Sequence, residues 1–146
     1  MTAALCIDAS VAVKRLFAEI DSDKARSLLG GAAAAGQRLI APAQFPVEVT
    51  SAVYKRVRSG HLSLDEAVAR IGRLADMPVE LVNPDGLREP ALRIAAGANM
   101  KWVHDAFYVA LAEIEQCDLW TADEQLHAAV RGTHPNVRLL SAYSAG

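Results

Sequence analysis

Four acidic residues lie in four separate short motifs of this chain, and their types and positions favour metal chemistry. The motifs are LCIDASVAV with Asp8, APAQFPVEVTSA with Glu48, HDAFYVALAE with Asp105, and LWTADEQL with Asp123. Carboxylates that converge repel one another, and at neutral pH they stay ionised together only where a cation neutralises them. Hard oxygen ligands with few His or Cys residues favour Mg²⁺ or Mn²⁺ over zinc. The pattern therefore predicts metal-dependent phosphodiester chemistry.

Three of these acids also have an ordinary structural explanation. Asp8 directly precedes a helical segment, and Asp is a common helix N-cap. The segment Thr121-Ala-Asp-Glu124 fits a capping box, in which Thr121 is the cap and Asp123 is a first-turn acid favoured by the helix dipole. Asp105 also lies at a helix start, where the dipole alone stabilises a carboxylate.

Glu48 is harder to explain as a purely structural residue. It lies beside Phe45 and Ala52, at the edge of the apolar face of a helix. A glutamate so close to the core needs a partner for its charge. Lys55, two turns further along nearly the same face, is one candidate, and a metal ion is the other.

The elements that must position these acids alternate between short apolar strands and amphipathic helices. We expect strands at residues 4–8, 38–42, 79–82, 117–122 and 136–140. We expect helices, from apolar positions at helical spacing and from capping patterns, at residues 9–19, 21–29, 43–59, 63–77, 83–98, 104–115 and 123–131. The alternation predicts one α/β domain over residues 1–146, with a mostly parallel sheet covered by helices on both faces. Asp8 and Asp123 follow strands, so both would project into the crevice at the carboxyl ends of the strands.

Several helix boundaries rest on local signals. Ser63-Leu-Asp-Glu66 fits a capping box that opens one helix, and Pro78 should stop that helix. Asn83-Pro84 fits a cap followed by a first-turn proline. The Gly30-Gly31 pair and the alanine run after it obscure the end of the second helix.

Composition and charge narrow the class of protein. The 146 residues are 52% hydrophobic and 22% charged, which predicts a globular domain with one substantial core. The net charge of −2 provides no global attraction for nucleic acid, so any such contact must come from local Lys and Arg residues and from metal. An acid already at position 8 argues against a signal peptide, and no apolar run approaches the roughly 20 residues that cross a bilayer. Cys6 and Cys117 lie in apolar strands and are expected to be reduced core residues, so we expect a cytoplasmic protein.

Other kinds of site find little support. The chain has no G-x-x-x-x-G-K-[ST] loop, no G-x-G-x-x-G turn and no evident Ser-His-Asp arrangement. Its four histidines show no zinc-ligand spacing with the cysteines. Trp102 and Trp120 are expected in the core or at its rim rather than as stacking platforms for bases.

Together, the four acidic motifs resemble those of the PIN-domain nucleases, and most closely the VapC-type toxins of bacterial toxin–antitoxin pairs. The matching segments are Asp8-Ala-Ser10, Pro46-x-Glu48-Val-x-Ser-Ala52, Asp105-Ala-Phe-Tyr-Val-Ala-Leu-Ala112 and Leu119-x-Thr121-Ala-Asp123-x-x-Leu126. Each motif is weak alone, but the four occur in the family's order between residues 5 and 126. One departure is the run Lys101-Trp-Val-His104, where many relatives carry small polar and aromatic residues. It concerns the substrate contacts on this side and not the metal site.

The resemblance implies a five-stranded parallel sheet and an endoribonuclease, a hydrolase that depends on Mg²⁺ or Mn²⁺. Asp8, Glu48 and Asp105 match the family's metal-binding acids, and Asp123 matches its more variable fourth acid. We expect Asp8 and Asp105 to be the principal ligands, with Glu48 and Asp123 binding through water or holding a second ion. Hydrolysis would leave a 5′-phosphate and a 3′-hydroxyl.

Further residues near the acids are candidates for supporting roles. Ser10 and Thr121 match accessory polar positions near the metal in the family. Candidate contacts to the RNA, chosen by proximity in sequence, are Lys14, Arg15, Lys101 and His104. A solvated helix face is the ordinary explanation for each of the basic residues.

The resemblance also implies partners. A VapB-like antitoxin would cover the cleft, and the toxin would form a homodimer that pairs two antitoxin chains. Candidate residues for a hydrophobic antitoxin groove are Val11, Phe17, Leu28 and Val53, for which burial in the core is the alternative.

Other functions remain open on the sequence. They are a PIN-domain nuclease outside a toxin–antitoxin system and a non-catalytic PIN-like interaction module, although intact acids at all four positions argue against the latter. Haloacid-dehalogenase-like phosphatases and response-regulator receivers lose support, because Asp8 is followed by Ala-Ser rather than by a second Asp and no paired acids precede it.

Overall fold

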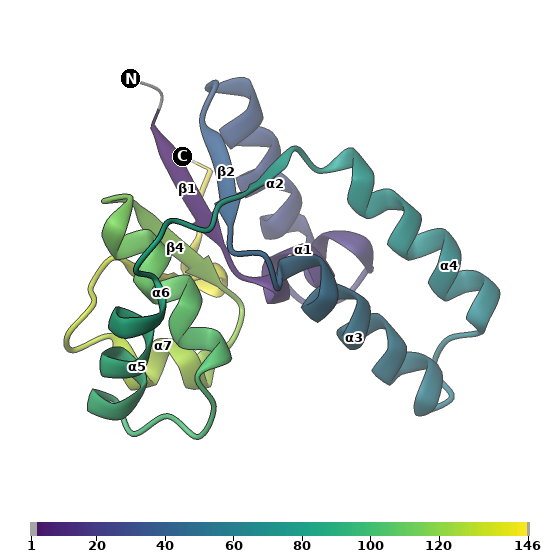
Figure 1. Cartoon of the computed structure of the whole chain (residues 1–146). Helices are drawn as coiled ribbons and strands as arrows, with labels where there is room; N and C mark the ends of the chain where they lie inside the picture. The colour runs from purple at the N-terminus through teal and green to yellow at the C-terminus, as the bar shows by residue number, and fades with distance from the viewer. Residues whose placement is uncertain (1–2, 146) are drawn as a thin grey trace.

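Within residues 3–145, five strands form one parallel sheet in the order β3-β2-β1-β4-β5 (Figure 1). The strands are β1 (Ala4–Ile7), β2 (Arg38–Ala41), β3 (Val79–Leu81), β4 (Asp118–Thr121) and β5 (Val137–Leu139). In the computed structural model, which describes residues 3–145, β1 is central, and Leu5 pairs with Leu39 of β2 and with Asp118 of β4. The strands β2 and β3 are added on one side of β1, and the later strands β4 and β5 are added on the other side, so the strand order reverses between β1 and β4. The crevice for a ligand therefore lies where β1 and β4 end.

Within residues 3–145, the chain also contains seven α-helices and two 3₁₀ helices, the last of which follows β5. They are α1 (Ala9–Leu16), α2 (Ser22–Ala34), α3 (Phe45–Arg58), α4 (Leu64–Gly72), η1 (Arg73–Asp76), α5 (Arg88–Gly97), α6 (His104–Ile114), α7 (Glu124–Val130) and η2 (Leu140–Ala142). In Figure 1, α3 and α4 extend to one side, whereas α5, α6 and α7 gather on the other. The expected α/β domain with a five-stranded parallel sheet is confirmed. Residues 1, 2 and 146, which the expected domain also included, lie outside the described residues.

Helix α6 and the two central strands supply much of the core. Ile7 of β1 and Leu119 of β4 are fully buried, and so is every residue of the run Tyr108–Ala112 in α6. This helix contacts β1, β4 and α5, which explains why it is apolar on nearly all sides. Full burial of one large apolar side chain contributes about 1.5–3 kcal/mol, so the helix that carries Asp105 is firmly held against the sheet. Cys6 is buried as expected, whereas Cys117 is half-buried, and both are free thiols.

The structure corrects two helix boundaries. Helix α2 continues through Gly30-Gly31 to Ala34 and ends where Gly36 adopts a φ of 69°. Two hydrogen bonds, from the amides of Gly36 and Gln37 to the carbonyls of Ala33 and Ala32, close the helix there as a Schellman motif. The expected end of this helix at Leu29 is wrong because neither Gly30 nor Gly31 has a positive φ, and both continue the helix.

The expected helix start at Asn83-Pro84 is also wrong. Helix α5 begins only at Arg88, after a turn in which Gly86 has a φ of 83°. The Asn83 side chain instead accepts a 3.2 Å hydrogen bond from the amide of Ala43, which joins two loops. By contrast, the capping box of Ser63 and Glu66 is confirmed by both of its hydrogen bonds.

Most of the residues proposed for a hydrophobic groove belong to the core. Val11, Leu28 and Val53 are each at most 3% exposed. Phe17 is half-buried, and the guanidinium groups of Arg56 and Arg70 lie over its ring. Periodicity identified the apolar faces of these helices correctly, but those faces cover the sheet and one another.

Over residues 3–145, every helix is too short or too polar to span a bilayer.

Candidate active site

Asp8 stands at the junction of β1 and α1, and its carboxylate is held by two hydroxyl groups. Ser10 donates a 2.7 Å hydrogen bond to Oδ2, and Thr121 donates one of 2.8 Å to the same oxygen. Asp8 occupies the N-cap position of α1, but its side chain makes no capping hydrogen bond. Asp8 therefore occupies the predicted N-cap position, but its side chain does not cap the helix.

The two hydroxyls also join the ends of β1 and β4. The Oγ atom of Ser10 accepts a 2.9 Å hydrogen bond from the amide of Ala122, and Thr121 Oγ1 accepts one of 3.0 Å from the amide of Asp123. The two hydroxyl oxygens lie 3.3 Å apart. Thr121 is fully buried, so this small network fixes the orientation of Asp8.

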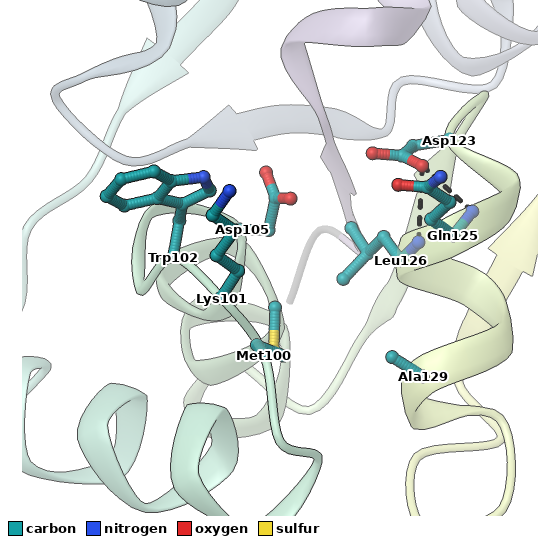
Figure 2. Close-up of a pocket in the computed structure, with 8 residues that line it drawn as sticks. All are labelled: Met100, Lys101, Trp102, Asp105, Asp123, Gln125, Leu126 and Ala129. Atoms are coloured by element: carbon teal, nitrogen blue, oxygen red, sulfur yellow. Dashed lines mark hydrogen bonds between the residues drawn. The ribbon is translucent and has the colours of Figure 1, made fainter.

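Asp123, and not Thr121, caps α7. Its Oδ1 accepts hydrogen bonds from the amides of Gln125 at 2.9 Å and Leu126 at 3.2 Å (Figure 2). The expected capping box with Thr121 and Glu124 is wrong because the Thr121 hydroxyl is already committed to Asp8. Figure 2 shows the Asp123 carboxylate on the side of the pocket opposite Asp105.

Glu48, in the first turn of α3, has a tyrosine as its partner. The Tyr108 hydroxyl donates a 2.8 Å hydrogen bond to Oε1, whereas Oε2 is buried and has no hydrogen-bond partner in the described chain. Lys55, the expected alternative, is exposed and is not ion-paired with Glu48. Burial raises the pKa of Glu48 to about 7, and the charges of Asp8 and Asp105 add to that effect against the Tyr108 hydrogen bond.

Asp105 lies in the first turn of α6, where the helix dipole favours a negative charge. Its pKa is nevertheless raised to about 6, chiefly by burial and then by the charges of Asp8 and Asp123, while His104 opposes the shift. Burial likewise raises the pKa of Asp8, against the hydrogen bonds from its two hydroxyl partners. Burial is therefore the chief cause of the raised pKa of both carboxyls, and neighbouring acids add to it.

The charges of the four predicted acids influence one another in pairs, and Asp8 and Asp105 are the acids that connect Glu48 with Asp123. Asp8 raises the pKa of both Glu48 and Asp105, and Asp123 raises the pKa of Asp8 and Asp105. The structure does not bring them into a closed metal cage: across residues 3–145, no three Asp, Glu, His or Cys side chains are placed to hold one ion together. The acids share an edge of the sheet rather than a single coordination point.

The residues at this edge fit a divalent cation. The donors are all carboxylates, and Glu48 offers a buried oxygen that nothing in the described chain satisfies. None of the ion pairs within residues 3–145 joins a Lys or Arg to any of the four acids. Mg²⁺ keeps several of its waters and needs only one or two direct carboxylates, so a partly open set of acids suits it.

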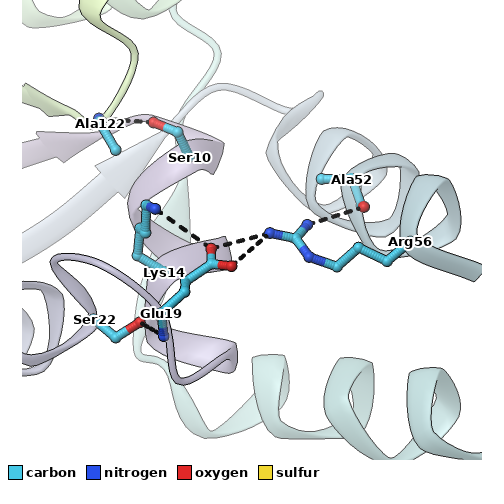
Figure 3. A network of polar contacts seen from close by, with 7 residues as sticks. All are labelled: Ser10, Lys14, Glu19, Ser22, Ala52, Arg56 and Ala122. Atoms are coloured by element: carbon cyan, nitrogen blue, oxygen red, sulfur yellow. Dashed lines mark hydrogen bonds and ion pairs between the residues drawn. The ribbon is translucent and has the colours of Figure 1, made fainter. Parts of the chain in front are cut away.

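The candidate RNA contacts fall in different places. Lys14 forms an ion pair of 3.5 Å with Glu19, which also binds Arg56 of α3 at 3.0 Å (Figure 3). Arg15 lines a separate cavity between α1, α2 and η1, away from the acids. Lys101 lines the pocket that contains Asp105 and Asp123 (Figure 2).

His104 is adjacent to that pocket. Its backbone carbonyl accepts a 3.0 Å hydrogen bond from the Gln44 side chain, and its ring lies 6.3 Å from that of Trp102. Of the four candidates, Lys101 and His104 are thus beside the acids, Lys14 is already paired, and Arg15 is elsewhere.

Sequence reasoning missed Tyr108 as a residue of the site. Tyr108 lies three positions after Asp105, so the two share one face of α6. A tyrosine on the same face as a candidate ligand, in a helix apolar nearly all round, was the available signal. Buried tyrosines need a hydrogen-bond partner, and the carboxylate of Glu48 provides it.

Comparisons with known proteins agree with this architecture. A model of the PIN-domain family matches residues 5–132. No curated protein matches the chain. Among solved structures, the crystal structure of PAE2754 from Pyrobaculum aerophilum is similar, with a TM-score of 0.65 over 88% of this chain and 86% of that chain at 21% identity. At that identity the likeness concerns the fold. Because the family match spans most of the chain and all four acidic motifs, the chain belongs to the PIN-domain family.

Proposed function

We propose that this chain is an endoribonuclease that depends on Mg²⁺ or Mn²⁺ and hydrolyses RNA at the edge formed by Asp8, Glu48, Asp105 and Asp123. PIN domains are generally metal-dependent nucleases. The observation that carries the proposal for this chain is the buried Oε2 of Glu48, which has no hydrogen-bond partner within residues 3–145 although Asp8 and Asp105 are near enough to raise the pKa of Glu48. An unsatisfied buried carboxylate oxygen is costly, and a hydrated divalent ion would satisfy it.

Each acid has a proposed role that comes from the family resemblance. Asp8 and Asp105 would hold the ion, while Glu48 and Asp123 would bind its waters or a second ion. The bound ion would lower the pKa of a water and polarise a phosphoryl oxygen. Hydrolysis would leave a 5′-phosphate and a 3′-hydroxyl.

Other residues of the chain support that chemistry. Ser10 and Thr121 donate to Asp8 and so keep its charged form oriented. Tyr108 fixes one oxygen of Glu48 and leaves the other available. Lys101, unpaired within residues 3–145 and beside Asp105, would attract the phosphate backbone.

The direct test is cleavage of RNA by metal-stripped protein with and without Mn²⁺ or Mg²⁺. We expect activity only with metal, and a loss of more than about 100-fold in Asp8→Asn and Asp105→Asn, because changes to residues behind metal ligands already cost about 10- to 100-fold. Glu89→Gln, which removes an exposed acid of α5, should cleave normally. Wild-type rates in Asp8→Asn or Asp105→Asn would overturn the assignment of the site.

Folding must be checked in the same variants. Asparagine at position 8 can still accept hydrogen bonds from Ser10 and Thr121, and it removes one of several repelling charges. The melting temperature of metal-free Asp8→Asn should therefore equal or exceed that of the wild type. Such a result would show that the loss of cleavage in Asp8→Asn comes from the missing carboxylate and not from unfolding.

We further propose that the chain acts as the toxin of a toxin–antitoxin pair, with a VapB-like antitoxin as partner and a homodimer as the working form. The order of the four motifs supports this role. So does the uncompensated charge, because an Arg or Lys side chain from a partner would compete with metal for the acids. The exposed apolar side chains of α3 and α4 offer a surface for such contacts: Val47, Tyr54, Leu64 and Val68.

The toxin role has its own test. Expression of the chain alone should arrest growth, co-expression of the neighbouring upstream gene should restore it, and Asp8→Asn should be harmless at equal abundance. Normal growth on strong induction of soluble wild-type protein would contradict the toxin role. That result would not decide the nuclease activity, which the cleavage assay tests separately.

A further inference from the structure

Trp102 is an exposed aromatic residue beside the acids. Its side chain is 63% exposed, whereas Trp120 is 9% exposed and packs edge-on against Tyr143. The sequence suggested a position in the core or at its rim for both tryptophans; Trp120 lies in the core, whereas Trp102 lies on the surface. One exposed aromatic ring needs no explanation by itself. Trp102, however, lies on a fixed segment of backbone and lines a pocket that it shares with Asp105 and Asp123.

The backbone holds Trp102 in place between two packed helices. Helix α5 ends in a Schellman motif, in which Asn99 has a φ of 51° and the amide of Met100 donates a 2.9 Å hydrogen bond to the carbonyl of Ala95. Helix α6 begins at His104, and α5 packs against α6. Trp102 therefore lies on a short connection whose two ends are fixed, and not on a long loop.

A pocket of about 150 Å³ leads from the acids to Trp102 (Figure 2). Lys101, Trp102 and Asp105 line one side, and Asp123 and Gln125 at the start of α7 line the other. Two of the acids proposed to act on the phosphate thus form the walls at one end of the pocket. A ligand that enters it must already be next to the site of cleavage.

The lining is suited to a flat aromatic group with a polar edge. Trp102 offers a ring face, and Met100 and Leu126 add apolar contact. The Gln125 amide offers one donor and one acceptor group. The Lys101 ammonium lies 5.4 Å from the centroid of the Trp102 ring, where it would meet a phosphate that flanks a stacked base.

We propose that this pocket binds an unpaired base of the RNA, next to the scissile phosphate, with Trp102 as the stacking surface and Gln125 at the edge of the base. The proposal rests on the proposed nuclease function. Bases in a duplex are stacked on one another and cannot enter such a pocket, so the substrate is single-stranded at the cleavage site. The segment Lys101–His104, where the chain departs from the family motif, would then carry part of the specificity.

Binding can be measured without cleavage, because Trp102 is the exposed one of the two tryptophans. A short single-stranded RNA added to Asp8→Asn protein should quench the fluorescence, and the same sequence as a duplex should quench it far less. Because the next two variants lack the Trp102 indole, their affinity is measured by fluorescence anisotropy of an end-labelled RNA. Trp102→Ala should weaken binding by about 5- to 150-fold, the range that loss of one base–aromatic stack produces, whereas Trp102→Phe should retain most of the affinity. Equal affinity of Trp102→Ala and its parent would overturn the proposal.

Two further variants sharpen the test. Leu92→Ala removes an apolar side chain of α5 that is as exposed as Trp102, at 63%, but lies outside the pocket, and this variant should bind and cleave normally. Gln125→Leu keeps the backbone amide that Asp123 accepts from, so α7 stays capped, but it should change which base is preferred at the cleaved position. An unaltered preference would remove Gln125 from the proposal.

The outcomes also separate this proposal from the proposed function. Metal-dependent cleavage with wild-type KM and kcat in Trp102→Ala would refute the base site and leave the nuclease intact. Trp102-dependent quenching by single-stranded RNA, without cleavage under any metal, would refute the nuclease and leave the base site standing.

Discussion

The Tyr108 hydroxyl donates a 2.8 Å hydrogen bond to Oε1 of Glu48, across 60 residues of sequence. Tyr108 is fully buried in α6, three residues after Asp105, and Glu48 lies in the first turn of α3. The contact therefore links two helices that each carry a candidate metal ligand. It fixes one oxygen of Glu48 and leaves the other, Oε2, without a partner in the described chain.

Tyr108→Phe should reduce activity in a pH-dependent way. The hydroxyl lowers the pKa of Glu48, which burial raises to about 7, so its loss should raise that pKa further. More Glu48 would then be protonated at neutral pH, and protonated carboxyls bind metal poorly. We expect the acidic limb of the rate against pH to move to higher pH, with partial recovery above pH 8.

The control for this variant is Tyr143→Phe. Tyr143 is a half-buried tyrosine that packs against Trp120 and lies away from the acids. Its loss of a hydroxyl should leave the pH profile unchanged. If Tyr108→Phe and Tyr143→Phe give the same profile, the hydrogen bond to Glu48 has no functional role.

Without metal, the protein should become less stable as pH rises from about 4 to about 7. Glu48 and Asp105 have raised pKa values of about 7 and about 6 in the folded state, against ordinary values of 4.5 and 3.8. The folded state therefore binds more protons than the unfolded chain between those values, and stability falls with increasing pH there. The stability that each protonated carboxyl contributes is fully present below its ordinary pKa. That contribution is lost as the pH rises through the raised pKa of the folded state.

Thermal melting in EDTA across that pH range measures the effect. The fall should be smaller in Glu48→Gln, which has no proton to lose at this position. Stability that rises steadily from pH 4 to 7 in the wild type would contradict the crowded, buried arrangement of the acids.

Divalent metal should reverse this loss. An ion that binds the folded acids and not the unfolded chain stabilises by about 2.7 kcal/mol at 100 times its dissociation constant, which is several degrees in melting temperature for a chain of this size. Mn²⁺ or Mg²⁺ should thus raise the melting temperature at pH 7.5, less so in Glu48→Gln and normally in Glu89→Gln. A wild-type melting curve that millimolar metal leaves unmoved would show that the acids do not bind an ion together.

The sequence was informative about where the acids lie because backbone rules place them. A residue after a parallel strand projects at the carboxyl edge of the sheet, which located Asp8 and Asp123. The motifs of the family resemblance added Glu48 and Asp105 in the first turns of their helices. In the structure, the charge of Asp8 raises the pKa of both of these acids.

The sequence was uninformative about partners of side chains, because these depend on packing between distant segments. Helical spacing suggested Lys55 for Glu48, but the actual partner comes from another helix, and Lys55 faces solvent. The capping pattern at residues 121–124 was mistaken for the same reason. Thr121 could serve either as a cap or as a donor to Asp8, and only the proximity of β1 and β4 decides between them.

Thr121→Val tests whether that choice matters for function. Valine has nearly the same shape, so the fully buried site should stay filled while the hydrogen bond to Asp8 Oδ2 and the acceptor for the amide of Asp123 are lost. Loss of the hydroxyl should destabilise the fold by about 1–3 kcal/mol, because it leaves a buried partner unsatisfied. It should also raise the pKa of Asp8 further, since the Thr121 hydrogen bond opposes the effect of burial. We expect metal-dependent cleavage to fall by about 10- to 100-fold, as for other residues that orient metal ligands.

Thr133→Val, which removes an exposed hydroxyl after α7, is the matched control and should retain full activity. Because Ser10 still donates to Asp8, higher pH or higher Mn²⁺ should restore part of the activity of Thr121→Val. Cleavage at the wild-type rate in folded Thr121→Val would mean that Asp8 needs no orientation from this hydroxyl, and the hydroxyl pair would then be a structural feature of the β1–β4 junction alone.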